Sequence, residues 1–140
     1  MPEGYSYDPD YLEELKKAGF EIGVHGLKHD GWLFLSRRLF RKRVKKINAY
    51  LTSLGGGFRS PLTHRHPEWM QDLKLQYDSS FFDVDPFESM PGGVGWLWPF
   101  FIGNFLELPY TLPQDNTLFN ILGEKTPLIW QKSLKKMDLR

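Results

Sequence analysis

The sequence predicts an α/β fold in which parallel strands are joined by crossover helices. Three short segments that contain aromatic or β-branched residues are expected to be strands, at residues 20–24, 58–60 and 77–81. Segments with helical periodicity separate them, so strand and helix alternate as in a βαβαβ unit. Glycines such as Gly19 and Gly55 stand where a helix would end before the next strand.

The helices of this unit have recognisable start signals. Asp8 can cap a first helix that has Pro9 in its first turn. Ser36 can cap a second helix that continues to about Leu54, with apolar residues at helical spacing. A short third helix is expected to begin at Pro67.

The remainder of the chain alternates less regularly. Residues 83–103 combine turn-forming residues with aromatic ones, so we expect a long loop there. This loop is either a flap over a binding site or an aromatic cover for the rim of the sheet, and the sequence leaves both open. A fourth strand is expected at 105–109, and helices at 116–122 and 127–137.

Length and composition predict one domain spanning residues 1–140. The chain is 41% hydrophobic and 25% charged, which is typical of a globular protein. Its formal net charge of +1 does not favour a nucleic-acid or membrane-surface partner. Because there is no cysteine, disulfides and thiolate metal sites are excluded, and any zinc would be held by histidine and carboxylate.

The sequence shows neither a signal peptide nor a membrane span. Residues 1–5 lack a basic start and an apolar segment, and the most apolar window, 94–105, is too short to cross a bilayer. The compartment is left open, with the cytoplasm as the default expectation.

The second helix has a strongly basic stretch at residues 37–46. Such a stretch could bind nucleic acid or another anionic polymer. We favour a solvated outer face, because the chain has no overall basic excess and no second basic element.

A candidate metal site follows the first expected strand. His25 and His29 are flanked by glycines and followed by Asp30, at the end of a strand where parallel α/β folds bind ligands. Imidazoles with an orienting carboxylate suit a divalent metal. Two surface histidines in a turn would give the same pattern, and the local segment does not distinguish these readings.

Three segments together resemble the polysaccharide deacetylase family, also known as the nodulation-deacetylase homology domain or carbohydrate esterase family four. VHGLKHD at 24–30 resembles its metal-binding His-x-x-x-His motif, and GFRSP at 57–61 resembles its Arg-x-Pro motif. YDSSF at 77–81 resembles the strand that follows. The segments occur in the family's order, and the resemblance covers roughly residues 9 to 112.

The resemblance implies a partial (β/α) barrel and metal-dependent removal of acetyl groups from a polysaccharide or amino sugar. For an N-acetyl group, the bond that is hydrolysed is a carbon–nitrogen bond other than a peptide bond. It implies a divalent metal, with zinc as the leading candidate, held by His25 and His29. Asp30 would support these ligands from a second layer, and Arg59 would orient the catalytic machinery, pairing with Asp78, Asp30 or a bound anion. The partner would be an acetylated polysaccharide or oligosaccharide, and the expected substrate contacts are Pro61, Trp96 and Trp98.

Two parts of the family pattern are missing. The family takes a third metal ligand and a base from a Thr-Phe-Asp-Asp motif on the first strand, and a general acid from a Leu-x-His motif near the domain end; this sequence has neither. We therefore expect a domain truncated at both ends, lacking the first catalytic strand and the C-terminal strand. His64 or His66 could replace the missing ligand, although histidines in polar loops are usually solvated.

These gaps keep a second function open. The chain could be a catalytically inactive, carbohydrate-binding remnant of the same fold. The sequence does not define an oligomeric state, but a partial barrel leaves sheet edges unpaired, so we expect the isolated chain to associate.

Overall fold

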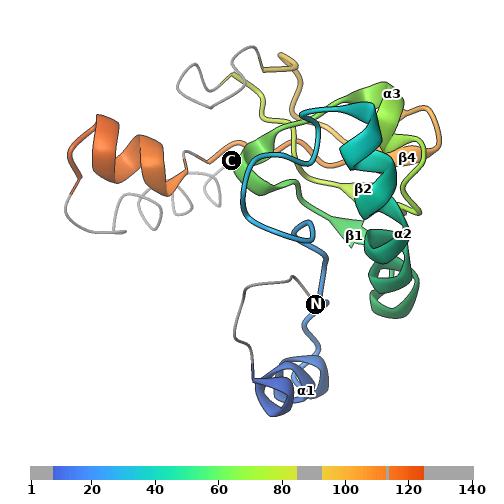
Figure 1. Ribbon diagram of the computed structural model, residues 1–140. Coiled ribbons are helices and arrows are strands. Elements are labelled where there is room, and N and C mark those ends of the chain that lie inside the picture. The colour runs from blue at the N-terminus through green and yellow to red at the C-terminus, as the bar shows by residue number, and fades with distance from the viewer. Residues whose placement is uncertain (1–7, 85–92, 113, 125–140) are drawn as a thin grey trace.

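The computed structural model describes residues 8–84, 93–112 and 114–124, which form a small mixed α/β structure (Figure 1). Its sheet has the strand order β1-β2-β4-β3. The β1–β2 and β2–β4 pairs are parallel, whereas β3 and β4 are antiparallel. The strands are β1 (Gly57–Phe58), β2 (Tyr77–Asp78), β3 (Phe100–Ile102) and β4 (Phe105–Glu107).

The predicted α/β class is therefore confirmed, with a mostly parallel sheet. The described strands do not show a barrel. A further parallel contact, between Phe82 and Tyr110, continues the β2–β4 neighbourhood beyond the regular strands.

The first expected strand, 20–24, is reduced to one residue. Val24 forms an isolated parallel bridge with Phe58, through hydrogen bonds from Val24 N to Gly57 O at 2.8 Å and from Arg59 N to Val24 O at 3.0 Å. Phe20 is 63% exposed, so the described part of the chain leaves the start of this segment uncovered. The prediction of a longer strand is wrong, but the parallel placement of its end beside β1 is confirmed.

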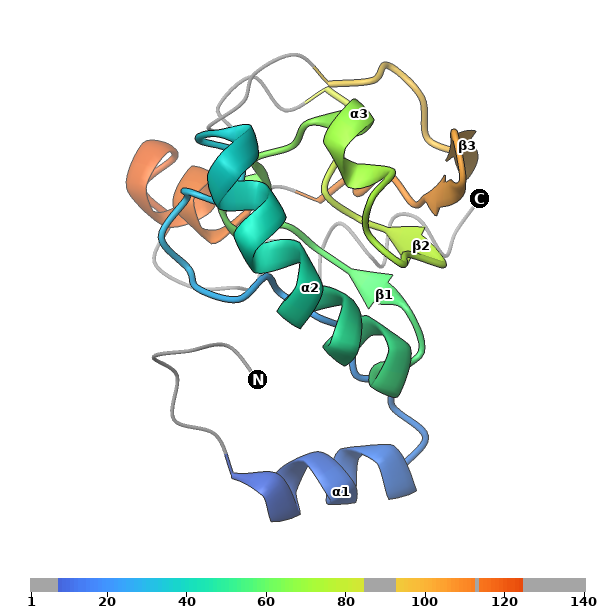
Figure 2. The same ribbon diagram turned by 45° about the vertical axis from the view of Figure 1, so that its right-hand side comes forward.

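Helix α1 (Pro9–Lys17) forms where the sequence predicts it but buries no side chain. The Asp8 carboxylate accepts the Asp10 N–H at 3.0 Å, which satisfies one of the helix's unpaired N-terminal donors. In both ribbon views α1 stands away from the sheet (Figure 2). The cap stabilises the start of this helix, and Leu12 and Leu15 are half-buried.

Helix α2 (Arg37–Leu54) covers the sheet and supplies much of the core (Figure 2). It begins where Ser36 Oγ accepts the Leu39 N–H at 3.3 Å, and it ends at Gly55, whose φ of +95° is readily reached only by glycine. Three of its apolar side chains are buried in the core, those of Phe40, Ile47 and Leu51. They belong to the same hydrophobic cluster as Val24 and residues of β1 and β4. Each such fully buried side chain contributes about 1.5–3 kcal/mol through removal from water.

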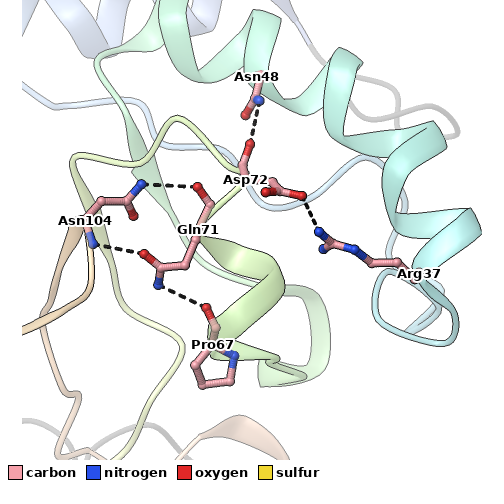
Figure 3. A network of polar contacts seen from close by, with 6 residues as sticks. All are labelled: Arg37, Asn48, Pro67, Gln71, Asp72 and Asn104. Carbon is pink, nitrogen blue, oxygen red and sulfur yellow. Dashed lines mark hydrogen bonds and ion pairs between the residues drawn. The ribbon is translucent and has the colours of Figure 1, made fainter.

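Helix α3 (Pro67–Met70) is short and begins at the predicted residue, and polar contacts connect its end to two other elements (Figure 3). The side-chain amide of Asn48 in α2 donates to the backbone carbonyl of Asp72 at 2.9 Å. Arg37, in the same helix, donates to the Asp72 carboxylate at 2.6 Å. Gln71 accepts the Asn104 N–H at 3.0 Å through Oε1 and accepts its side-chain amide at 3.1 Å through the backbone carbonyl. The two bonds between Gln71 and Asn104 hold the turn between β3 and β4 against the end of α3.

That hairpin corrects the prediction of one continuous loop at 83–103. Strand β3 lies within this segment and turns into β4 through Gly103, at φ +61°, and Asn104. Phe100 and Ile102 are half-buried and Phe101 is exposed, which is the alternation of an edge strand. The expected helix near 116–122 appears as η2 (Asn116–Ile121), a π-helical segment, whereas the helix expected at 127–137 lies outside the described residues.

No helix in the described part of the chain is long and apolar enough to cross a membrane.

Candidate functional site

A cleft of about 810 Å³ lies where the parallel segments end. Its walls come from three neighbouring segments, at residues 23–25, 57–60 and 77–79. His29, the turn at Leu62 and Thr63, and residues 114–115 complete the lining. In parallel sheets this end is where ligands bind, because the loops that follow the strands converge there.

One hydrogen bond fixes the orientation of His25. Its Nδ1 lies 2.9 Å from the backbone carbonyl oxygen of Arg59. Because a carbonyl can only accept, Nδ1 carries the hydrogen, and the lone pair of the neutral ring is on Nε2. This is the arrangement that a histidine ligand normally uses, with one nitrogen held by the protein and the other available to an ion.

The surroundings of His25 favour its neutral form. Partial burial of the ring, which is the largest cause, lowers its pKa, and the charges of His29 and Arg59 lower it further. The hydrogen bond to the Arg59 carbonyl raises the pKa of His25, but by less than burial lowers it.

His25 and His29 lie side by side, as a shared metal ion would require. Their ring centroids are 5.2 Å apart and their planes are tilted by 48°. The two rings are therefore close enough for one ion to contact both, and metal binding by them remains a prediction. Among the residues that the structure describes, no group of three His, Cys, Asp or Glu side chains is placed to hold a metal ion, so a third protein ligand is not identified there.

Asp30 is bound to α2. Its two carboxylate oxygens accept from Arg43 Nη1 at 2.7 Å and Nη2 at 2.5 Å, and Oδ1 also accepts the Trp32 N–H at 3.0 Å. The Arg43 guanidinium is the main cause that lowers the pKa of Asp30 to about 2. Asp30 thus anchors the loop that carries His29, and a direct bond from it to either histidine remains a prediction.

Arg59 contributes to the cleft through its backbone and its position. Its guanidinium carbon lies 4.2 Å from the centroid of the Tyr110 ring, a cation–π contact. In the described residues, the two carboxylates predicted as its partners are engaged elsewhere, Asp30 by Arg43 and Asp78 by Ser80. The orienting role of Arg59 remains a prediction.

The histidine loop and the Arg59–Pro61 corner are packed closely together. A Cβ added to Gly26, which has φ +68°, would lie 2.6 Å from Cγ of Pro61, so only glycine fits there. Pro61 is buried in this contact, which places it under the loop that joins the two histidines. A direct contact between Pro61 and a substrate remains a prediction.

The turn that follows, η1 (Pro61–Thr63), is strained. Leu62 and Thr63 have φ values of +54° and +52°, a left-handed conformation that costs a residue other than glycine about 1–2 kcal/mol. Both residues line the cleft. Strain of this kind is concentrated at binding sites, because the surrounding structure must hold it in place.

Two predicted substrate contacts lie away from the cleft lining. Trp96 and Trp98 are 53% and 69% exposed, and neither is among the residues that form the cleft. Their role in substrate binding remains a prediction.

His64 and His66 are also placed elsewhere. His64 Nδ1 is 3.0 Å from the Gly31 carbonyl oxygen, and the His66 ring stacks on Trp69 with centroids 4.1 Å apart. The structure brings neither to the cleft lining, so the alternative in which one of them completes the metal shell is not supported.

Sequence reasoning missed several residues of the cleft. Gln114 and Asp115 follow β4 by a few residues, and Tyr77 and Ser79 flank the buried Asp78 on β2. A usable signal was present, because polar residues beyond the ends of adjacent parallel strands meet at one edge of the sheet.

A buried polar network adjoins the cleft wall. Asp78 and Glu107 are both 0% exposed and are directly paired between β2 and β4. Burial raises the pKa of both, and together with the charge of Asp78 it raises the pKa of Glu107 to about 10. Oε1 of Glu107 accepts the Phe81 N–H at 3.2 Å, whereas Oε2 is buried and has no hydrogen-bond partner among the described residues. Ser80 Oγ donates to Asp78 at 2.7 Å and accepts the Ser60 N–H at 2.8 Å, which links the carboxyls to the cleft.

Comparison with known proteins gives one positive result. The model of the polysaccharide deacetylase family matches residues 3–77, which include both histidines and the Arg59–Pro61 corner. No curated protein and no solved structure shows significant similarity to the chain.

Proposed function

We propose, because this chain belongs to the polysaccharide deacetylase family, that it is a metal-dependent hydrolase that removes acetyl groups from a polysaccharide or amino sugar. The observation that carries the proposal is the side-by-side placement of His25 and His29, with ring centroids 5.2 Å apart, at the end of the parallel segments. A partial barrel of the deacetylase type, in which the described sheet is one part, belongs to the same proposal.

His25 and His29 would hold the divalent metal, for which zinc is the leading candidate. When bound, the metal would polarise the acetyl carbonyl and lower the pKa of water, the two main contributions that such an ion makes to hydrolysis. The hydrogen bond from His25 Nδ1 to the Arg59 carbonyl would keep Nε2 directed at the ion.

Other cleft residues would bind and position the sugar. The cleft is within the size range of small-molecule sites, and Tyr77 and Ser79 add hydroxyl groups to its lining. Ser79 Oγ already donates to the Leu108 carbonyl at 3.0 Å, so its orientation is fixed before a ligand arrives.

The proposal is tested by acetate release from an N-acetylglucosamine oligomer and from acetylated xylan in the presence of zinc. We expect release by the full chain and at least about a hundredfold loss in His25→Ala and in His29→Ala. His66→Ala is the matched control, because this histidine stacks on Trp69 and does not line the cleft.

The same experiment separates the enzyme from the inactive remnant. Zinc and oligosaccharide binding with no acetate release from either substrate would refute the hydrolase and support a carbohydrate-binding role. Release that persists in both cleft variants would place the chemistry elsewhere in the chain.

A further inference from the structure

Helix α2 has a concentration of positive charge that its own stability does not explain. Seven of its first ten residues, 37–46, are Lys or Arg, and the helix contains no Asp or Glu. Arg37 and Arg38 lie in the first turn, where the helix dipole is already positive and a basic side chain is unfavourable. The whole chain has a formal net charge of only +1, so this charge is local.

Two of these side chains form ion pairs with acidic residues elsewhere in the fold. Arg37 pairs with Asp72 at 2.6 Å, and Arg43 makes a two-pronged contact with Asp30. Arg43 is 8% exposed, so its pairing is part of the packed structure. Holding the fold together therefore accounts for these two arginines.

Two of the lysines face a second, smaller cleft. This cleft has a volume of about 150 Å³ and is lined by Leu27, Lys28, Leu39, Lys42, Arg43 and Lys46. Positions 39, 42, 43 and 46 have the spacing of one helix face, and the other two residues come from the loop between His25 and His29. Three lysines and one arginine thus line a space that holds several water molecules.

We propose that this smaller cleft binds an acidic group, a carboxylate, phosphate or sulfate, of the glycan that the chain deacetylates. The proposal rests on the proposed function and narrows its substrate class to acidic polysaccharides. Lys28 directly precedes His29, so the short loop at residues 25–29 contributes residues to the lining of both clefts. A sugar chain held at the histidines would therefore have an acidic substituent within reach of the lysines.

A glycan fits this arrangement better than a nucleic acid does. Nucleic-acid binding usually requires a stripe of charge that follows many phosphates. Here the lysines surround one small cleft that has the apolar walls of Leu27 and Leu39. A sugar chain that carries one charged substituent at this point would fit such a cleft.

The test compares two double variants of α2 that remove the same charge at the same spacing. Lys42→Gln with Lys46→Gln alters the smaller cleft, whereas Arg41→Gln with Lys45→Gln alters exposed positions outside it. Calorimetry with the full chain measures binding of an acidic tetrasaccharide of alternating uronic acid and N-acetylhexosamine. A neutral tetrasaccharide of N-acetylglucosamine is the reference, and circular dichroism confirms that each variant is folded.

We expect the unmodified chain to prefer the acidic tetrasaccharide by about tenfold at low salt, and this preference to weaken near about 0.5 M salt. The Lys42/Lys46 variant should lose the preference, and the Arg41/Lys45 variant should keep it. Three results would overturn the proposal: no preference in the unmodified chain, equal loss in both variants, or tighter binding of a DNA duplex than of the acidic tetrasaccharide.

The binding readout also separates this proposal from the hydrolase. If acetate release is absent while the acidic preference and its loss in the Lys42/Lys46 variant persist, the hydrolase fails and the anion site stands. If His25-dependent acetate release is found without any acidic preference, the anion site fails and the hydrolase stands.

Discussion

His25 Nδ1 lies 2.9 Å from the Arg59 carbonyl oxygen, a bond that joins two loops separated by more than thirty residues. It assigns the tautomer of His25 and ties the histidine loop to the corner that contains Pro61. The two sequence motifs that share this site are therefore also structurally coupled.

The ion pair between Asp30 and Arg43 should stabilise the protein more than the one between Asp72 and Arg37. The first has side chains 25% and 10% exposed, and the second 46% and 34%. We expect Asp30→Asn to lower the free energy of unfolding by about 1–3 kcal/mol, because it leaves a buried guanidinium poorly paired. Asp72→Asn should cost less than about 1 kcal/mol, the usual range for an exposed pair. Urea unfolding measures both, and equal losses would contradict the account.

Glu107 should make stability fall as pH rises. Its folded pKa of about 10 lies above that of an unfolded glutamate, about 4.3, so between these values the folded chain binds a proton that the unfolded chain has released. The free energy of unfolding should then decrease across this window by at most about 1.4 kcal/mol per pH unit. Glu107→Gln should remove this slope, because glutamine cannot titrate.

The exposed Glu124→Gln variant is the control for that measurement and should unfold with the same pH profile as the unmodified chain. Parallel profiles for all three proteins would mean that Glu107 is ionised in the folded state. Denaturant unfolding between about pH 5 and pH 9 covers the relevant window.

Asp115 is the carboxylate among the described residues that line the larger cleft, and we expect it to act as the base in acetyl hydrolysis. If so, Asp115→Asn should lower acetate release by about a hundredfold or more, with zinc affinity unchanged. Asp10→Asn, on the solvent side of α1, is the matched control. Full activity in Asp115→Asn would exclude this role, and a parallel loss of zinc affinity would instead make Asp115 a metal ligand.

The elements that the sequence could predict are those with local signals. α2 begins and ends as expected because Ser36 and Gly55 satisfy their ends of the helix without help from distant residues. Strand β3 was missed because its pairing with β4 depends on a two-residue turn inside a segment that otherwise has loop composition. The segment around Phe20 has the composition of a strand, but no layer of the described structure covers it.

The candidate site divides in the same way. His25 and His29 lie close together because they are four residues apart in one loop, so the sequence could predict their proximity. The contact of Arg59 with Tyr110, and the presence of Asp115 in the same cleft, depend on how β4 returns beside β2. Long-range pairing of this kind leaves no local pattern, so the guanidinium was assigned to carboxylates that have other partners.

A crystal structure of the zinc-loaded chain, with the ion located by its anomalous signal, tests the central claim most directly. The account predicts a zinc ion bonded to both His25 and His29 at about 2.0–2.1 Å, with the Arg59 carbonyl still bound to His25 Nδ1. Zinc bound elsewhere, or the two imidazoles turned away from each other with no ion between them, would contradict it.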